Sequence, residues 1–113
     1  MSQTRCFELR TYTAHPGKLE PLHTRFRDHT CRLFARHGIE VVGFWRPVEG
    51  AAAQSQLVYL LAFPSREARE AAWSSFRSDP EWVAVRDESH RDGELTARIE
   101  SVLLSPTDYS PLK

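Results

Sequence analysis

Three polar side chains alternate with apolar ones near the start of the chain. In the run RCFELRTYT, residues 5–13, Glu8, Arg10 and Tyr12 stand two residues apart. Successive side chains of a strand point to opposite faces, so these three share one face. A guanidinium can hold an anion or a carbonyl group, and a carboxylate or phenol can orient a substrate or move a proton. These residues therefore line a polar cavity, or they form an ion pair that fixes the register of an interface.

A histidine and several aromatic residues could complete such a cavity. His29 falls near the centre of the apolar stripe that Leu22, Phe26 and Leu33 form on a predicted helix. At that position it is a satisfied core residue, a general base or an axial haem ligand. Aromatic side chains are the usual walls of a small-molecule pocket, and they are also ordinary core residues. The candidates for such walls are Phe26, Tyr59, Trp73 and one of Phe44 and Trp45.

The sequence lacks the motifs of several other kinds of site. It has no HExxH, no cysteine–histidine cluster, no GxSxG and no glycine-rich phosphate loop, so we expect no metal and no cofactor, with haem as the one candidate. Fifteen basic and fifteen acidic residues without a basic stripe argue against nucleic acid as a partner. Cys6 and Cys31 lack CxxC spacing and are expected to be reduced thiols. Cys31 is expected to project away from the apolar stripe.

The 113 residues are enough for one domain, which we expect to cover residues 1–113. Periodicity and turn residues predict the order β-α-β-β-α-β, with the second helix split in two. The predicted elements are strand 5–13, helix 18–37, strand 39–48, strand 56–63, helices 66–77 and 80–93, and strand 95–105. This order is the α+β ferredoxin-like pattern, a four-stranded antiparallel sheet with its helices on one face.

The predicted sheet leaves one face without a covering layer. Strand 56–63 is apolar on both sides, although no third layer is available within the chain. An exposed apolar face of this kind usually marks an interface, so we expect a homodimer through the open sheet face. With Phe7 and Leu9 beneath the helices, Glu8, Arg10 and Tyr12 would lie on that open face.

No membrane partner is expected either. The longest apolar run, residues 57–63, is too short to span a bilayer. A strand begins within the first ten residues and leaves no room for a targeting peptide, so we expect a cytoplasmic location.

Four runs of the sequence resemble the NIPSNAP family. They share with it the ELRxY strand, the PGK turn and the W…F…DPEW segment, and they are FELRTYTAHPGKLEPL, HGIEVVGFW, QLVYLLAFPSREAREAAWSSFRSDPEW and SVLLSPTDYSP. The resemblance implies a dimeric α/β barrel, in which two ferredoxin-like subunits pack sheet against sheet and each encloses a cavity. It implies no particular reaction, although other dimeric α/β barrels are small monooxygenases, haem-handling enzymes, decarboxylases or isomerases.

Three functions follow as hypotheses. The first is a homodimer that binds a small organic molecule in a cavity between sheet and helices, where Arg10 contacts an anion or carbonyl group, Tyr12 and Glu8 handle a proton and His29 acts as a base. The second is a monooxygenase, haem-dependent or cofactor-free, with His29 or His23 near the reactive centre. The third is a dimer without catalytic activity, in which the polar row only holds the subunits together.

Overall fold

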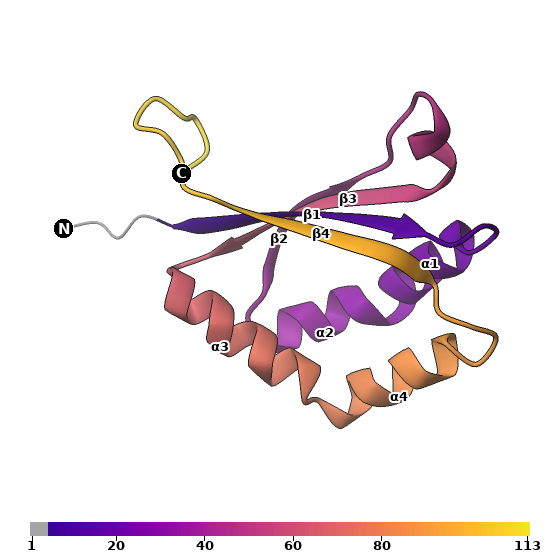
Figure 1. The fold of residues 1–113 in the computed structure, drawn as a ribbon. Helices are drawn as coiled ribbons and strands as arrows, with labels where there is room; N and C mark the ends of the chain where they lie inside the picture. Colours follow the sequence, from indigo (N-terminus) through magenta and orange to yellow (C-terminus); the bar gives the residue numbers. More distant parts are fainter. Residues whose placement is uncertain (1–4) are drawn as a thin grey trace.

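A four-stranded antiparallel sheet carries the helices α1, α2, α3 and α4 on one side (Figure 1). The computed structural model describes residues 5–113. Its elements are β1 Cys6–Ala14, α1 Leu19–Arg25, η1 Phe26–Thr30, α2 Cys31–Arg36, β2 Glu40–Trp45, η2 Ala51–Gln54, β3 Gln56–Phe63, α3 Arg66–Arg77, α4 Pro80–Ser89 and β4 Thr96–Leu104. The strand order is β2-β3-β1-β4, which confirms the predicted ferredoxin-like fold. No helix within residues 5–113 is both long and apolar enough to cross a bilayer.

Local signals set most element ends. Ser65 begins α3, because its hydroxyl accepts a hydrogen bond from the Ala68 amide at 3.1 Å. Asp79 begins α4 in the same way, accepting from the Glu81 amide at 2.8 Å, and Pro80 occupies the first helical position. The predicted strand at 39–48 is shorter in the structure, and α4 ends at Ser89 before the predicted residue 93.

The first long helix contains one wide turn, η1, between α1 and α2. The Cys31 amide donates to the Phe26 carbonyl five residues back, which is the hydrogen bond of a π-helix. The extra residue rotates the following side chains relative to an α-helix. Thr30 is therefore fully buried, whereas His29 is only half-buried. The prediction that His29 lies at the centre of the apolar stripe was wrong for this reason.

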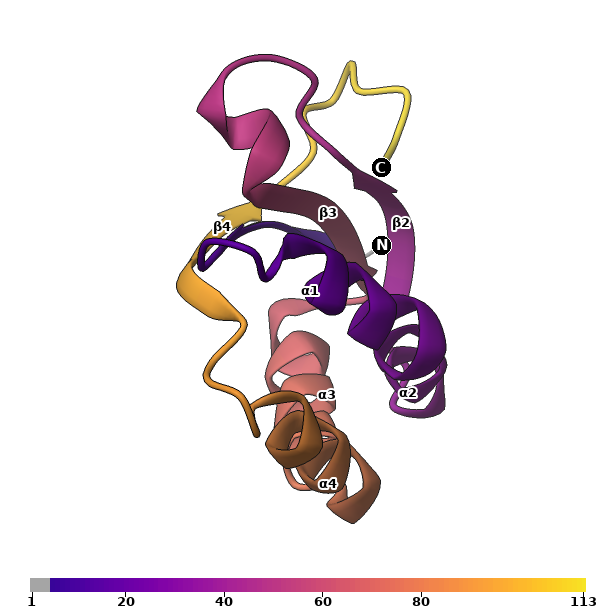
Figure 2. The same cartoon turned by 90° about the vertical axis from the view of Figure 1, so that its right-hand side faces the viewer.

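Aromatic side chains dominate the core between the sheet and the helices. Phe26 of η1 packs edge-on against Tyr59 of β3, with ring centroids 5.3 Å apart. Phe34 of α2 packs against Trp73 of α3, with ring centroids 5.6 Å apart, so the two helices contact each other on the same face of the sheet. Edge-to-face contacts of this kind add to the free energy gained from burial alone. Figure 2 shows α1 and α2 beside α3 and α4, all beneath the same face of the sheet.

The polar row of β1 faces the helices. Trp73 of α3 donates to Glu8 at 2.8 Å, and Tyr12 packs against Phe26 of η1 at 5.6 Å. The prediction that this row faces the open side of the sheet was therefore wrong. Strand periodicity fixes which residues share a face but not which face is covered, and the helices supply partners for the charges.

Apolar side chains remain exposed on the other face of the sheet. Trp45 of β2 is 52% exposed, and Val102 of β4 is 51% exposed. Leu9 and Leu60 pair across β1 and β3 between them and are half-buried. This face, called the open face below, has no covering layer of helices within residues 5–113 (Figure 1).

Candidate functional site

Glu8 is the centre of a buried hydrogen-bond network that joins two strands to α3. Its side chain is 0% exposed. Each donor belongs to the helix side of the sheet or to α3: Arg10 Nη1 at 2.8 Å, Arg69 Nε at 2.9 Å and Nη2 at 3.0 Å, Trp73 Nε1 at 2.8 Å and Ser101 Oγ at 2.6 Å. We call these residues, together with Tyr12 and Tyr59, the Glu8 network. Both carboxylate oxygens accept at least two hydrogen bonds each, which stabilises the ionised form of Glu8.

The environment of Glu8 has opposing effects on its pKa. Burial disfavours the charged form and would raise the pKa. Hydrogen bonds to the carboxylate, with those from Arg69 and Ser101 the largest, outweigh burial and lower the pKa of Glu8 to about 2. Glu8 is therefore ionised over the whole physiological pH range.

Arg10 connects Glu8 to a pair of tyrosines. Its Nε donates to the Tyr59 hydroxyl at 2.9 Å, its Nη2 donates to the Tyr12 hydroxyl at 3.2 Å, and the Tyr59 hydroxyl donates to that of Tyr12 at 2.9 Å. The guanidinium also lies 4.5 Å from the centre of the Trp73 ring. Burial, followed by the neighbouring Tyr12, raises the pKa of Tyr59, which therefore remains a neutral phenol.

The polar side-chain atoms of the Glu8 network thus form hydrogen bonds mainly with one another. The roles predicted for Arg10, Tyr12 and Glu8 in substrate contact and proton handling stay predictions. None of the three residues lines either of the two cavities described below. Their arrangement can hold the sheet and α3 in a fixed geometry.

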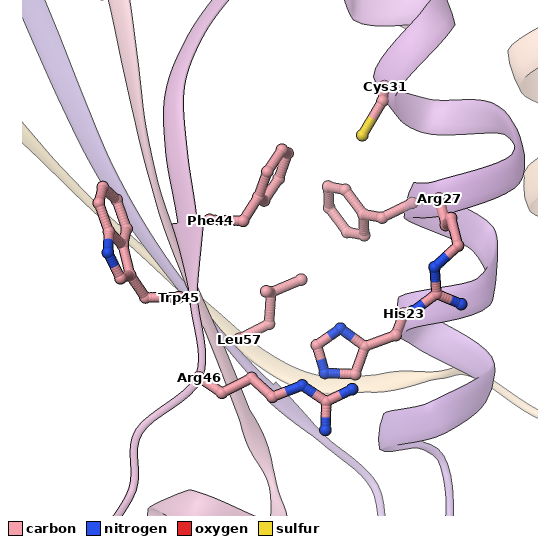
Figure 3. Close-up of a pocket in the computed structure, with 8 residues that line it drawn as sticks. His23, Arg27, Cys31, Phe44, Trp45, Arg46 and Leu57 are labelled. Carbon is pink, nitrogen blue, oxygen red and sulfur yellow. The ribbon is translucent and has the colours of Figure 1, made fainter.

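A cavity of about 320 Å³ lies between the first long helix and the strands β2 and β3 (Figure 3). We call it the β2 cavity. Its floor is apolar and aromatic, and two arginines stand at its rim. The lining residues are His23, Phe26, Arg27, Cys31, Phe44, Trp45, Arg46 and Leu57. Apolar walls with a few convergent polar groups are typical of small-molecule sites.

His23 is the buried polar group of the β2 cavity. The residue is 8% exposed, and its Nε2 has no hydrogen-bond partner within residues 5–113. Figure 3 shows the imidazole extending from the helix into the space beside Leu57 and Arg46. Burial lowers the pKa of His23, and the positive charges of Arg46 and Arg27 lower it further, while Glu20 opposes them. The imidazole is therefore neutral near pH 7 and can donate or accept one hydrogen bond.

Of the two aromatic residues left open by the sequence, Phe44 points into the cavity. Its ring lies 5.6 Å from that of Phe26. The Trp45 ring lies on the other side of β2 (Figure 3), folded over Gly43, so Trp45 contributes only to the rim. Cys31 also lines the cavity and is half-buried, in contrast to the prediction that it projects away from the stripe. Burial raises the pKa of the Cys31 thiol, which disfavours the reactive thiolate.

The structure brings some of the predicted site residues together and separates others. Tyr59 and Trp73 join the Glu8 network, and Phe26 lies between that network and the β2 cavity. His29 lies apart, with its Nδ1 2.9 Å from Arg32 Nη2. No cluster of three side chains suited to a metal ion occurs in the described part of the chain.

Sequence reasoning missed the partners of Glu8 and the burial of His23. Arg69 lies four residues before Trp73, so the two share a face of α3, and this spacing was the available signal. Ser101 lies on β4 opposite Arg10, which only the strand register reveals. His23 lay beside the predicted stripe and was weighed only as an alternative to His29.

Comparison with known proteins agrees with this architecture. The NIPSNAP family model matches residues 7–111. A NIPSNAP family protein of unknown function from Agrobacterium tumefaciens is 24% identical, with a TM-score of 0.84 over 100% of this chain and 97% of that one. A NIPSNAP-like domain protein from Burkholderia xenovorans is 19% identical, with a TM-score of 0.83 over 96% of this chain and 90% of that one.

A more distant crystal structure shares the fold alone. SnoaB, a cofactor-independent oxygenase from Streptomyces nogalater, is 18% identical, with a TM-score of 0.64 over 96% of this chain and 98% of that one. A search of curated proteins found no match. Since the family model covers nearly the whole sequence, the chain belongs to the NIPSNAP family.

Proposed function

We propose that this NIPSNAP domain binds a small organic molecule in the β2 cavity, and that the ligand combines an aromatic ring with a negatively charged group. The observation that carries the proposal is His23, whose imidazole extends into the cavity and whose buried Nε2 has no hydrogen-bond partner within residues 5–113. A buried polar atom without a hydrogen bond is unfavourable, so a ligand that supplies one is stabilised there. The cavity volume of about 320 Å³ is at the small end of the range for ligand sites.

The lining sets the chemistry of the ligand. Phe26, Phe44 and Leu57 offer apolar contact to a flat ring. Arg27 forms no ion pair within residues 5–113 and is free to bind a carboxylate at the rim, while Arg46 also contacts Glu20 at 3.1 Å. His23 would then meet a hydroxyl or carbonyl group deeper in the cavity.

Calorimetry with para-hydroxyphenylacetate tests this arrangement. We expect binding by the native chain, about tenfold weaker binding by His23→Leu and by Arg27→Gln, and weaker binding of the methyl ester. His29→Leu is the matched control and should bind as the native chain does, because His29 lies outside the β2 cavity. Equal binding of acid and ester, or no effect of His23→Leu, would contradict the proposal.

A second candidate function is cofactor-free oxygenation in the same cavity. The neutral His23 imidazole can accept the proton of an electron-rich phenol, and the resulting phenolate is the form that reacts directly with O2. The fold similarity to SnoaB supports testing it. An oxygen electrode with resorcinol should show uptake that depends on the protein and disappears in His23→Leu. Uptake at the buffer rate would remove this candidate.

We also infer that a second copy of the chain covers the open face, which would make the protein a homodimer. Exposed Trp45 and Val102 support this, since a contiguous apolar face of a sheet is unfavourable in water. Light scattering at micromolar concentration should give about twice the 13.0 kDa chain mass. Val102→Lys should give the monomer mass, whereas Val48→Lys, in an exposed loop, should not. A monomeric native chain would refute the inference.

A further inference from the structure

Arg25, in the last turn of α1, is a buried cation without a carboxylate partner. It is 8% exposed and forms no ion pair within residues 5–113. Its Nη1 donates to Ser89 Oγ at 3.1 Å and lies 3.4 Å from His90 Nε2, and its guanidinium lies 5.1 Å from the centre of the Trp82 ring. Its Nε has no hydrogen-bond partner in the described part of the chain. All these neighbours are neutral, so the charge of Arg25 is not balanced.

This environment is unfavourable for a guanidinium. A buried charge normally has an opposite charge beside it, because the free energy lost on desolvation exceeds the free energy gained from hydrogen bonds to neutral groups. Burial lowers the pKa of Arg25, and the nearby Arg86 lowers it further, against Tyr12 and Tyr59. Burial and the charge of Arg25 also lower the pKa of His90, which therefore stays neutral beside Arg25. An anion is the group that this position lacks.

Arg25 opens onto a second cavity, of about 670 Å³, between α1 and α4. We call it the α4 cavity. Figure 1 shows α4 below α1, at the end of the molecule where β4 begins. The apolar part of the lining is Pro21, Ala84, Val85 and Leu95, and the polar part is Glu20, Thr24, Arg25, His29, Glu88 and Ser89. The cavity shares no lining residue with the β2 cavity.

The two acidic residues of the α4 cavity do not neutralise Arg25. Glu20 pairs with Arg46 at 3.1 Å, and Glu88 pairs with Arg91 at 3.2 Å. Both carboxylates are mostly exposed and so stand at the entrance. Their charges repel a ligand with several negative charges. A single carboxylate is repelled less, because Glu20 and Glu88 are each already paired with an arginine.

We propose that the α4 cavity is a second binding site, in which Arg25 holds the carboxylate of an apolar monocarboxylic acid whose body lies against Val85 and Leu95. A guanidinium binds a carboxylate through two parallel hydrogen bonds, and the unpartnered Nε is one of the donors needed. The apolar walls accommodate an aliphatic chain or a ring. The ligand is therefore an acid of the octanoate type rather than a phosphate ester.

Calorimetry on the full chain with octanoate, and with octanol as its uncharged match, tests the site. We expect octanoate to bind at least tenfold more tightly than octanol. Arg25→Gln should remove that preference, and Val85→Trp, which fills the cavity and leaves the charge in place, should abolish binding of both. Arg98→Gln is the control and should keep the native affinity, because Arg98 is an exposed arginine of β4 that does not line the cavity. Equal affinity for the acid and the alcohol, or an unchanged preference in Arg25→Gln, would overturn the proposal.

The melting temperature distinguishes a ligand-binding role of Arg25 from a structural one. If Arg25 is an unbalanced charge that awaits a ligand, Arg25→Gln should melt at or above the native temperature without octanoate. A melting temperature lowered by several degrees would mean that Arg25 serves the fold. The two sites are also distinguishable, because His23→Leu should leave octanoate binding unchanged and Arg25→Gln should leave para-hydroxyphenylacetate binding unchanged. Loss of octanoate binding in His23→Leu would overturn the second site.

Discussion

The Glu8 network predicts a large effect from a nearly isosteric change, Glu8→Gln. The substitution keeps the shape of the side chain but removes the charge that two arginines share at 2.8 to 3.0 Å. Removing one partner of a buried ion pair costs about 3–5 kcal/mol, because the remaining charge is left without compensation. The pKa gives a similar figure: lowering it from 4.5 to about 2 in the folded state corresponds to about 3 kcal/mol of stability at neutral pH. We therefore expect a loss of about 3 kcal/mol.

Urea unfolding at pH 7, followed by tryptophan fluorescence, measures this loss, and Trp73 reports on the site directly because it donates to Glu8. Glu70→Gln is the matched control. Glu70 also pairs with Arg69, but its side chain is 62% exposed, so its removal should cost less than about 1 kcal/mol. A loss below 1 kcal/mol for Glu8→Gln, or equal losses for the two variants, would refute the assignment of Glu8 as the centre of the network.

The pH dependence gives an independent check. The pKa of Glu8 is lowered on folding, so its contribution is fully present above pH 4.5 and is lost as the pH falls toward about 2. The native chain should therefore approach the stability of Glu8→Gln between pH 4.5 and 2. A difference between them that stays constant over this range would show that charge is not the cause.

Three smaller predictions concern the scaffold. Gly38 follows α2 with φ of 73°, so Gly38→Ala should cost about 1 kcal/mol in urea unfolding, and a neutral result would argue against the left-handed helix end. Ser65→Ala removes the hydroxyl that caps α3 and should also cost about 1 kcal/mol, with Ser65→Asp restoring most of it. A Cβ on Gly43 would lie 2.7 Å from the exposed Trp45 ring, so Gly43→Ala should change unfolding by less than about 1 kcal/mol while it displaces the ring. Light scattering on dilution should then show weaker self-association, and an unchanged mass profile would place Trp45 outside the dimer contact.

Local sequence signals predicted the elements well. The observed bounds of β3 and α3 coincide with the predicted ranges 56–63 and 66–77, because Pro64 and Ser65 end one element and begin the next. The antiparallel sheet followed from the order of the elements, since few topologies accommodate β-α-β-β-α-β.

The site could be predicted only in part. Alternation correctly grouped Glu8, Arg10 and Tyr12, but a period of two is symmetric and does not say which face the helices cover. The deciding contacts come from Arg69 and Trp73, which lie on a helix distant in sequence. Pairing across such a distance is set by packing, and no local pattern of the strand contains it.

The position of His29 shows a different limit. A helical wheel assumes a constant rotation per residue, and the wide turn of η1 breaks that assumption between Phe26 and Thr30. No residue type marks such a turn, since it arises where apolar residues on both sides must face the same sheet. The same turn moves Cys31 toward the β2 cavity.

The wide turn also changes what a single-residue deletion would do. In an ordinary amphipathic helix, the loss of one residue rotates all later side chains about the helix axis, so that the apolar ones face solvent. Here η1 holds one residue more than an α-helical turn requires, and Asp28 within it is exposed. Deleting Asp28 would relax the turn to a regular helix while Leu22 and Leu33 stay on the core face. A chain that lacks this one residue can therefore keep the same core face on both halves of the helix.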